Sequence, residues 1–91
     1  MTTSATTSIT GNFIQSFPTE RGRTEFSFLR KTTLLSDKYF VLAMDKNLKA
    51  HWFTMEKRNG RWVINDTVKV PDWIQNMEDK LAEAIALKNL S

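Results

Sequence analysis

The sequence contains no cysteine, one histidine, three glycines and two prolines in 91 residues. Without cysteine the chain has neither disulfides nor thiolate metal ligands, which is compatible with a reducing compartment. No run reaches the roughly 18 apolar residues that a membrane-spanning helix needs. The first ten residues, "MTTSATTSIT", lack the basic and apolar regions of a secretory signal. We therefore expect a cytoplasmic protein with no membrane partner.

Motifs that carry catalysis are also missing. The lone His51 has no cysteine, serine or carboxylate partner at a spacing typical of a catalytic or metal-binding motif. Glu78 and Asp79 are adjacent in a predicted helix, so their side chains point in different directions. The basic segments 21–23 ("RGR") and 57–61 ("KRNGR") do not form a glycine-rich turn before a helix, which a phosphate-binding loop requires. We expect no enzymatic activity, no cofactor and no metal site.

The residues that are present indicate one small folded domain. Hydrophobic residues make up 41% of the chain and charged residues 25%, which is ordinary for a globular protein. Seven of the first ten residues are serine or threonine, a composition that buries almost nothing. We expect a disordered Ser/Thr-rich tail over residues 1–11 and a single α+β domain over residues 12–91.

The clearest local signal is a β-hairpin in residues 49–66, "KAHWFTMEKRNGRWVIND". Asn59-Gly60 stands between two arms of alternating apolar residues, which favours a two-residue type I′ turn. That turn fixes the register of the arms, with Met55 opposite Ile64 and Lys57 opposite Trp62.

Two further strands precede this hairpin. "TEFSFLRK" (24–31) alternates as a half-buried strand does, whereas "KYFVLAM" (38–44) is continuously apolar and is typical of a central strand. Phe13, Ile14 and Phe17 allow a short edge strand before Pro18, which has no N–H for a central ladder. The core of the prediction is a four-stranded antiparallel meander.

A helix follows the strands. Pro71 suits the first turn of a helix, and Asp72 favours its positive N-terminal end. Apolar residues then recur at three-and-four spacing on one stripe: Trp73, Ile74, Met77, Leu81, Ala84 and Ile85. The predicted fold class is α+β, a two-layer domain in which one C-terminal amphipathic helix packs on one face of the meander.

The period of two assigns strand residues to the two faces of the sheet. The hairpin register places Phe53, Met55, Trp62 and Ile64 on one face. An even-numbered loop after the central strand adds Phe40, Leu42 and Met44 to that face, and Phe26 and Phe28 then complete the core under the helix. An odd-numbered loop exchanges the faces of the central strand. We prefer the even loop because it gathers the bulkiest side chains in the core.

With the even loop, the opposite face is also apolar. It carries Leu29, Ala43 and a candidate binding face formed by Trp52, Tyr39, Arg23, Lys31, Arg58, Arg61, Val41 and Val63. A contiguous apolar patch with nothing to cover it usually marks a binding or assembly site. As an alternative, the segment through Phe13 and Phe17 folds back over this patch and leaves no site.

Charge is consistent with an anionic partner for the sheet. Residues 1–70 carry a net charge of +5 and residues 71–91 carry −2. We therefore expect a binding domain that takes single-stranded nucleic acid, with Trp52 and Tyr39 stacking on bases and the four cations meeting phosphates. The alternative is that the same face binds another protein or forms a homodimer. The order of strands and helix over residues 24–88 resembles the PUR repeats, and this resemblance implies single-stranded nucleic-acid binding and dimer formation.

Overall fold

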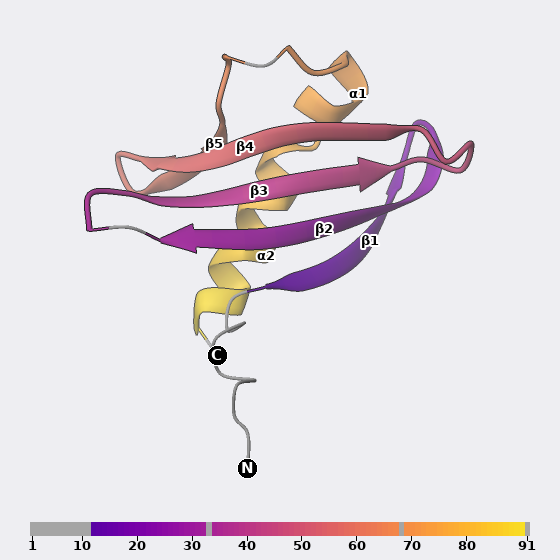
Figure 1. Cartoon of the computed structure of the whole chain (residues 1–91). Helices are drawn as coiled ribbons and strands as arrows, with labels where there is room; N and C mark the ends of the chain where they lie inside the picture. The colour runs from indigo at the N-terminus through magenta and orange to yellow at the C-terminus, as the bar shows by residue number, and fades with distance from the viewer. Residues whose placement is uncertain (1–11, 33, 68, 91) are drawn as a thin grey trace.

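The computed structural model describes residues 12–32, 34–67 and 69–90, so the expected tail over residues 1–11 lies outside the described residues. These form one antiparallel sheet with the strand order β1-β2-β3-β4-β5, followed by two helices (Figure 1). The elements are β1 (Phe13–Thr19), β2 (Gly22–Thr32), β3 (Asp37–Met44), β4 (Ala50–Arg58), β5 (Arg61–Ile64), α1 (Asp72–Gln75) and α2 (Glu78–Leu90). The predicted α+β class is confirmed, with five strands and two helices in place of four and one. Neither helix of the described part is long and apolar enough to cross a membrane.

β1 is the predicted edge strand, and it continues through Pro18 because only one of its sides pairs. The Phe13 ring stacks on Phe28 with a centroid distance of 4.3 Å, and Phe17 meets Phe26 edge-to-face at 5.7 Å. Both rings of β1 therefore lie on the helix side of the sheet. The alternative in which this segment folds over the other face is wrong, because its strand pairing holds it in the sheet.

The β4–β5 hairpin has the predicted turn and register. Asn59 and Gly60 have φ angles of 53° and 80°, as a type I′ turn requires. Met55 pairs with Ile64 and Lys57 pairs with Trp62.

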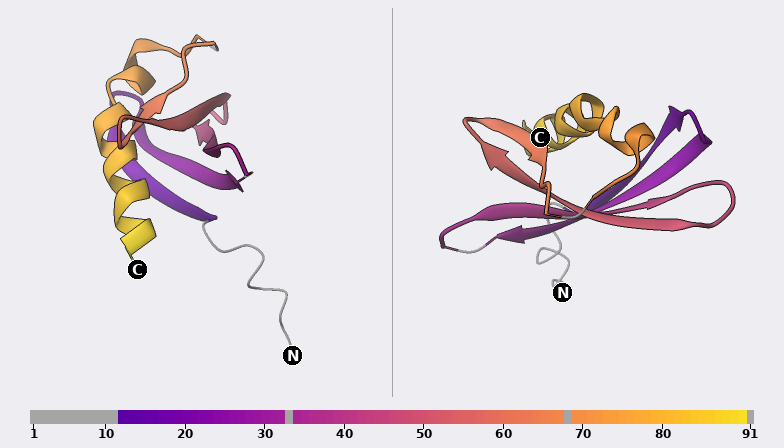
Figure 2. Two further views of the ribbon diagram at one scale, coloured as in Figure 1. Left: turned by 90° about the vertical axis from the view of Figure 1, so that its left-hand side faces the viewer. Right: turned by 90° about the horizontal axis from the view of Figure 1, so that it is seen from above.

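The helical segment begins at Asp72 as predicted but is interrupted after its first turn. The six predicted stripe residues are all buried. Trp73 and Ile74 belong to α1, and Leu81, Ala84 and Ile85 belong to α2, which lies along one face of the sheet (Figure 2). Glu78 ties the start of α2 to the sheet, since its Oε2 accepts a hydrogen bond of 2.7 Å from the backbone N–H of Ile64. We call the helix side of the sheet the covered face and its other side the open face.

The assignment of β3 to the two faces is the main correction. Met44 pairs with Ala50, which leaves an odd loop of residues 45–49. In that loop Asp45 Oδ1 accepts hydrogen bonds from the backbone N–H groups of Asn47 and Lys49, at 2.9 and 3.0 Å. Leu48 has a φ of 63°, the left-handed conformation that usually falls to glycine after a type I turn.

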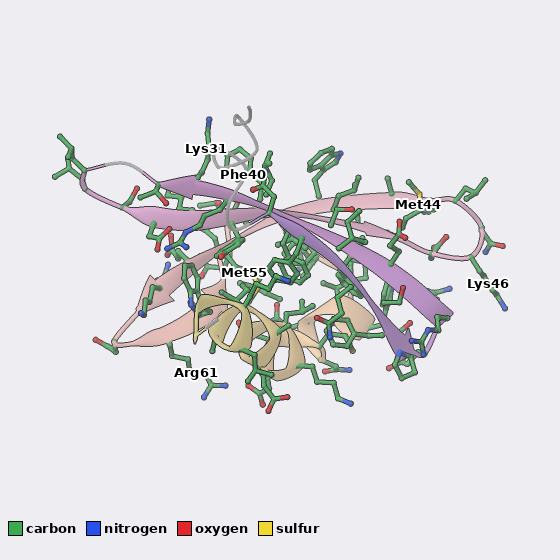
Figure 3. The ribbon with its side chains drawn as sticks, turned by 90° about the horizontal axis from the view of Figure 1, so that it is seen from below. Lys31, Phe40, Met44, Lys46, Met55 and Arg61 are labelled. Atoms are coloured by element: carbon green, nitrogen blue, oxygen red, sulfur yellow. The ribbon has the colours of Figure 1, made fainter. Side chains whose placement is uncertain are left out.

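The odd loop exchanges the faces of β3, so the preferred even-loop arrangement is wrong. Tyr39, Val41 and Ala43 are fully buried on the covered face. Tyr39 meets the Trp62 ring edge-to-face at 5.1 Å, so its ring is part of the aromatic core. Figure 3 shows Phe40 on the open face and Met55 between the sheet and the helix.

Candidate protein-binding face

The open face carries a contiguous group of apolar side chains contributed by four neighbouring strands. The cross-strand pairing aligns them in two rows, the first through Ile14, Ser27, Leu42 and Trp52 and the second through Leu29, Phe40 and Thr54. We call its five apolar members the apolar strip: Ile14, Leu29, Phe40, Leu42 and Trp52. Four of them are well exposed, Ile14 at 64%, Trp52 at 62%, Leu29 at 48% and Phe40 at 38%. An exposed apolar group of this size on a small domain usually marks an interaction site.

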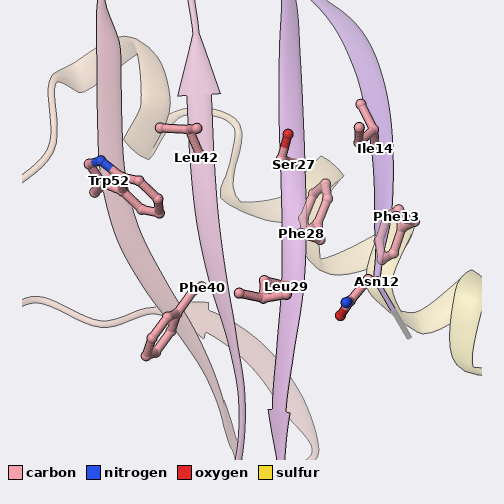
Figure 4. Close-up of a pocket in the computed structure, with 9 residues that line it drawn as sticks. All are labelled: Asn12, Phe13, Ile14, Ser27, Phe28, Leu29, Phe40, Leu42 and Trp52. Carbon is pink, nitrogen blue, oxygen red and sulfur yellow. The ribbon is translucent and has the colours of Figure 1, made fainter. Parts of the chain in front are cut away.

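The apolar strip is hollowed rather than flat. A depression of about 550 Å³ extends from β1 to β4, and its lining includes all five residues of the strip (Figure 4). A second hollow of about 160 Å³ lies between Phe40 and Trp52. The amide oxygen of Asn12 at the rim already accepts a hydrogen bond of 2.9 Å from the backbone N–H of Arg30. The hollow therefore presents mainly apolar surface.

Charged side chains lie at both ends of the strip. Lys31 and Lys38 pair directly across β2 and β3 at one end, and Glu25 lies on β2 at the other end. Both Glu25 and Lys31 are exposed, and neither side chain makes a hydrogen bond or ion pair with another described residue. Like charges directly opposite one another on a sheet are unfavourable, so the lysine pair favours a negative charge above it.

Glu56, a carboxylate at the lysine end of the strip, already has hydrogen-bond partners. It accepts a hydrogen bond of 2.6 Å from Arg58 Nε and one of 2.9 Å from the Asn65 amide. These two hydrogen bonds, the one from Arg58 first, hold the pKa of Glu56 below its ordinary value. Glu56 lies beside Lys38 on the next strand, so the cation left without a nearby carboxylate is Lys31.

The structure separates the predicted binding face into two groups. Tyr39 and Val41 are buried in the core, because the odd loop turns them to the covered face. Arg58 is paired with Glu56. Arg61 forms an ion pair with Asp79 of α2 and lies on the helix side of the sheet (Figure 3).

The remaining predicted residues stay on the open face. Trp52, Lys31 and Arg23 are exposed there, and Val63 lies half-buried at the β5 margin, opposite Glu56. Sequence reasoning missed Ile14, Phe40 and Leu42. Alternation within β3 did place Phe40 and Leu42 together, and only the length of the following loop was needed to turn them outward.

The groups suited to chemistry are dispersed in the described part of the chain. His51 lies on β4 with its ring edge-on to Trp73 at a centroid distance of 5.5 Å, so it packs beside the core. The structure brings no three histidine, aspartate or glutamate side chains of the described residues close enough to hold a metal ion.

Comparisons of the chain with protein-family models, with curated proteins and with solved structures give no match.

Proposed function

We propose that this chain is a self-association module, in which the open face of one copy packs on the open face of a second. The observation that carries the proposal is the apolar strip, which spans four strands and has no covering element in the described part of the chain. Packing two such sheets gives a homodimer with the layer order helix, sheet, sheet, helix. Face-to-face packing of sheets about 10 Å apart is a common way to bury apolar faces.

The size of the open face is suitable for such a dimer. Four strands at a spacing of about 4.8 Å make a face roughly 15 to 20 Å wide. Over the 11 residues of β2, at about 3.3 Å per residue, such a face covers roughly 550 to 720 Å², which approaches the surface of about 800 Å² per partner that a stable interface buries. The strip supplies an aromatic centre in Phe40 and Trp52, and Glu25 and Lys31 supply a charged rim.

The proposal is tested by the solution mass of the chain over a range of concentrations. We expect the parent chain to be a dimer that dissociates on dilution. Phe40→Lys should give a monomer with an unchanged circular dichroism spectrum, because a lysine in the middle of the interface loses its water.

The matched control is Leu87→Lys on α2, which places the same charge at an apolar side chain that is 61% exposed and lies outside the strip. This variant should remain a dimer. A parent chain that is a monomer at every concentration would overturn the proposal.

A second candidate function is single-stranded nucleic-acid binding by the same face. It is supported by the exposed ring of Trp52, which lies on the same face as Arg23 and Lys31. The open face offers fewer groups for nucleic acid than the sequence predicted, since the Tyr39 ring is in the core and Arg58 is paired with Glu56.

This candidate is tested with a short single-stranded oligonucleotide. Stacking should quench tryptophan fluorescence, and Trp52→Ala should weaken binding by about 1 to 3 kcal/mol. Equal binding of single and double strands, or binding that survives Trp52→Ala, would leave only non-specific charge attraction.

A further inference from the structure

We infer that Glu25 and Lys31 determine how two copies stack, by pairing Glu25 of each copy with Lys31 of the other. This inference rests on the proposed self-association. Two aligned sheets related by a two-fold axis have two possible arrangements, because the axis in the interface runs either along the strands or across them. The two arrangements bring different residues together, so the charges of the open face distinguish them.

Along β2 and β3, the open face presents four cross-strand pairs in a fixed order. They are Glu25 with Met44, Ser27 with Leu42, Leu29 with Phe40, and Lys31 with Lys38. The two inner pairs are uncharged and the two outer pairs carry charge of opposite sign. The order therefore gives the strip an acidic end and a basic end.

An axis along the strands places each pair over the same pair of the second copy. Lys31 then faces the partner's Lys38, and four ammonium groups gather at one end of the interface. Glu25 faces the partner's Met44 at the other end and gains no counter-charge. Juxtaposed like charges in an interface are strongly unfavourable, so the charges oppose this arrangement.

An axis across the strands reverses the order of pairs in the second copy. Leu42 then packs on the partner's Phe40, so the apolar residues still cover one another. Glu25 faces the partner's Lys31, and the symmetry makes this contact twice. Both side chains are exposed and make no ion pair within the described part of their own chain, so the contact breaks no existing pair.

The rotation of about 30° between aligned sheets displaces the ends of the strip relative to each other. The flexible four-carbon stem of lysine accommodates such a displacement, since it requires no fixed bidentate geometry. The arrangement across the strands is therefore the one that satisfies both the apolar strip and the charged ends.

Charge reversal distinguishes the two arrangements in purified protein. Glu25→Lys should weaken the dimer about tenfold or more, since each new lysine meets the partner's Lys31. Lys31→Glu should weaken it by a similar factor, since two carboxylates then meet. The doubly reversed chain, Glu25→Lys with Lys31→Glu, should recover the parental dissociation constant.

Mixing the two single variants gives the sharpest result. In a mixed dimer the chain with Glu25→Lys supplies two lysines and the chain with Lys31→Glu supplies two carboxylates, so both contacts are complementary. We expect each variant to be mostly monomer alone and the mixture to form heterodimers, measured by native mass spectrometry. Glu20→Lys, in the β1–β2 turn away from the strip, is the control and should leave the parental dimer unchanged.

The possible results separate this inference from the proposal on which it rests. A monomeric parent chain overturns the self-association itself. A dimeric parent in which Glu25→Lys has no effect while Lys31→Glu strengthens association overturns the inference alone, because it indicates the axis along the strands, where Lys31 meets the partner's Lys38.

Discussion

The two faces of the sheet can be compared most directly on β3, which contributes three apolar side chains to each. Tyr39, Val41 and Ala43 lie beneath the helices and are fully buried. Phe40 and its neighbours Leu42 and Met44 alternate with them on the open face, where Phe40 remains 38% exposed. The open set of Phe, Leu and Met is the larger and more apolar of the two, so apolar character alone does not determine which set is covered.

What distinguishes the faces is the geometry around β3. The loop 45–49 has an odd number of residues. This number determines which side chains of β3 share a face with Trp62 and Ile64 of the β4–β5 hairpin. The helices then cover the face that holds Trp62 and Ile64. The open face is left with an apolar strip that no other described element covers.

The largest difference in stability should come from truncating two neighbouring side chains on β3. Tyr39→Ala should reduce the free energy of unfolding by about 3 to 5 kcal/mol, because it leaves a large cavity in the core. Phe40→Ala should reduce the monomer's stability by less than about 1 kcal/mol, because the ring is not enclosed. Urea denaturation at a protein concentration below the dimer dissociation constant measures both. Equal losses at the two positions would contradict the assignment of the faces.

A similar contrast exists between two leucines of α2. Leu81 is fully buried against the sheet, whereas Leu87 is exposed. Leu81→Ala should cost about 2 to 5 kcal/mol of stability, and Leu87→Ala about 0.5 kcal/mol or less. Cooperative unfolding of the Leu81→Ala variant at the parental midpoint would show that α2 does not close the core.

The turn that sets the faces contains a strained residue. Leu48→Gly should raise the free energy of unfolding by about 1 kcal/mol, because a side chain in the left-handed region costs roughly that much and glycine avoids it. Leu35→Gly, at another exposed loop leucine, which lacks a positive φ, is the control and should give no gain. No stabilisation by Leu48→Gly would refute this account of the turn.

The smallest effect concerns pH and the covered face. Arg30 donates hydrogen bonds to Asp37 from Nε at 3.1 Å and from Nη2 at 2.7 Å, and this holds the pKa of Asp37 below its ordinary value. The unfolded chain therefore binds this proton at higher pH than the folded chain does. The stabilisation is present above the ordinary aspartate pKa and is lost as the pH falls through the lowered value.

Asp37→Asn should therefore flatten the acid side of the stability profile, measured by thermal unfolding between about pH 2 and 6. A variant with the parental slope would show that this pair does not contribute to the acid dependence.

Local patterns predicted most of the fold. The Asn59-Gly60 turn, the apolar stripe of the helices and the alternation of β2 all act within a few residues, so they are legible in the sequence. The assignment of β3 to the two faces could not be predicted in this way. It depends on the length of the loop 45–49, in which Leu48 adopts a conformation that is rare for leucine. The wrong loop length also led to Tyr39 being predicted on the binding face, where the structure has Phe40.

The ion pairs of the predicted cations could not be predicted, because they join residues whose proximity is not visible in the sequence. Arg61 reaches Asp79, which is distant in sequence and lies on the first turn of α2. Trp52 and Lys31 were placed correctly, because the hairpin register and the alternation of β2 determine their face.

The apolar character of both sides of β3 affects the order of folding. Burial of the open side of this strand releases at least as much hydrophobic free energy, so a chain that collapses early can bury Phe40 and Leu42 in place of Tyr39 and Val41. Escape from that trap requires β3 to separate from both of its neighbours. A chain that closes the Asp45–Lys49 turn first avoids it, because the carboxylate of Asp45 fixes the loop length before any long-range contact forms. We therefore expect early formation of the β3–β4 hairpin to favour productive folding.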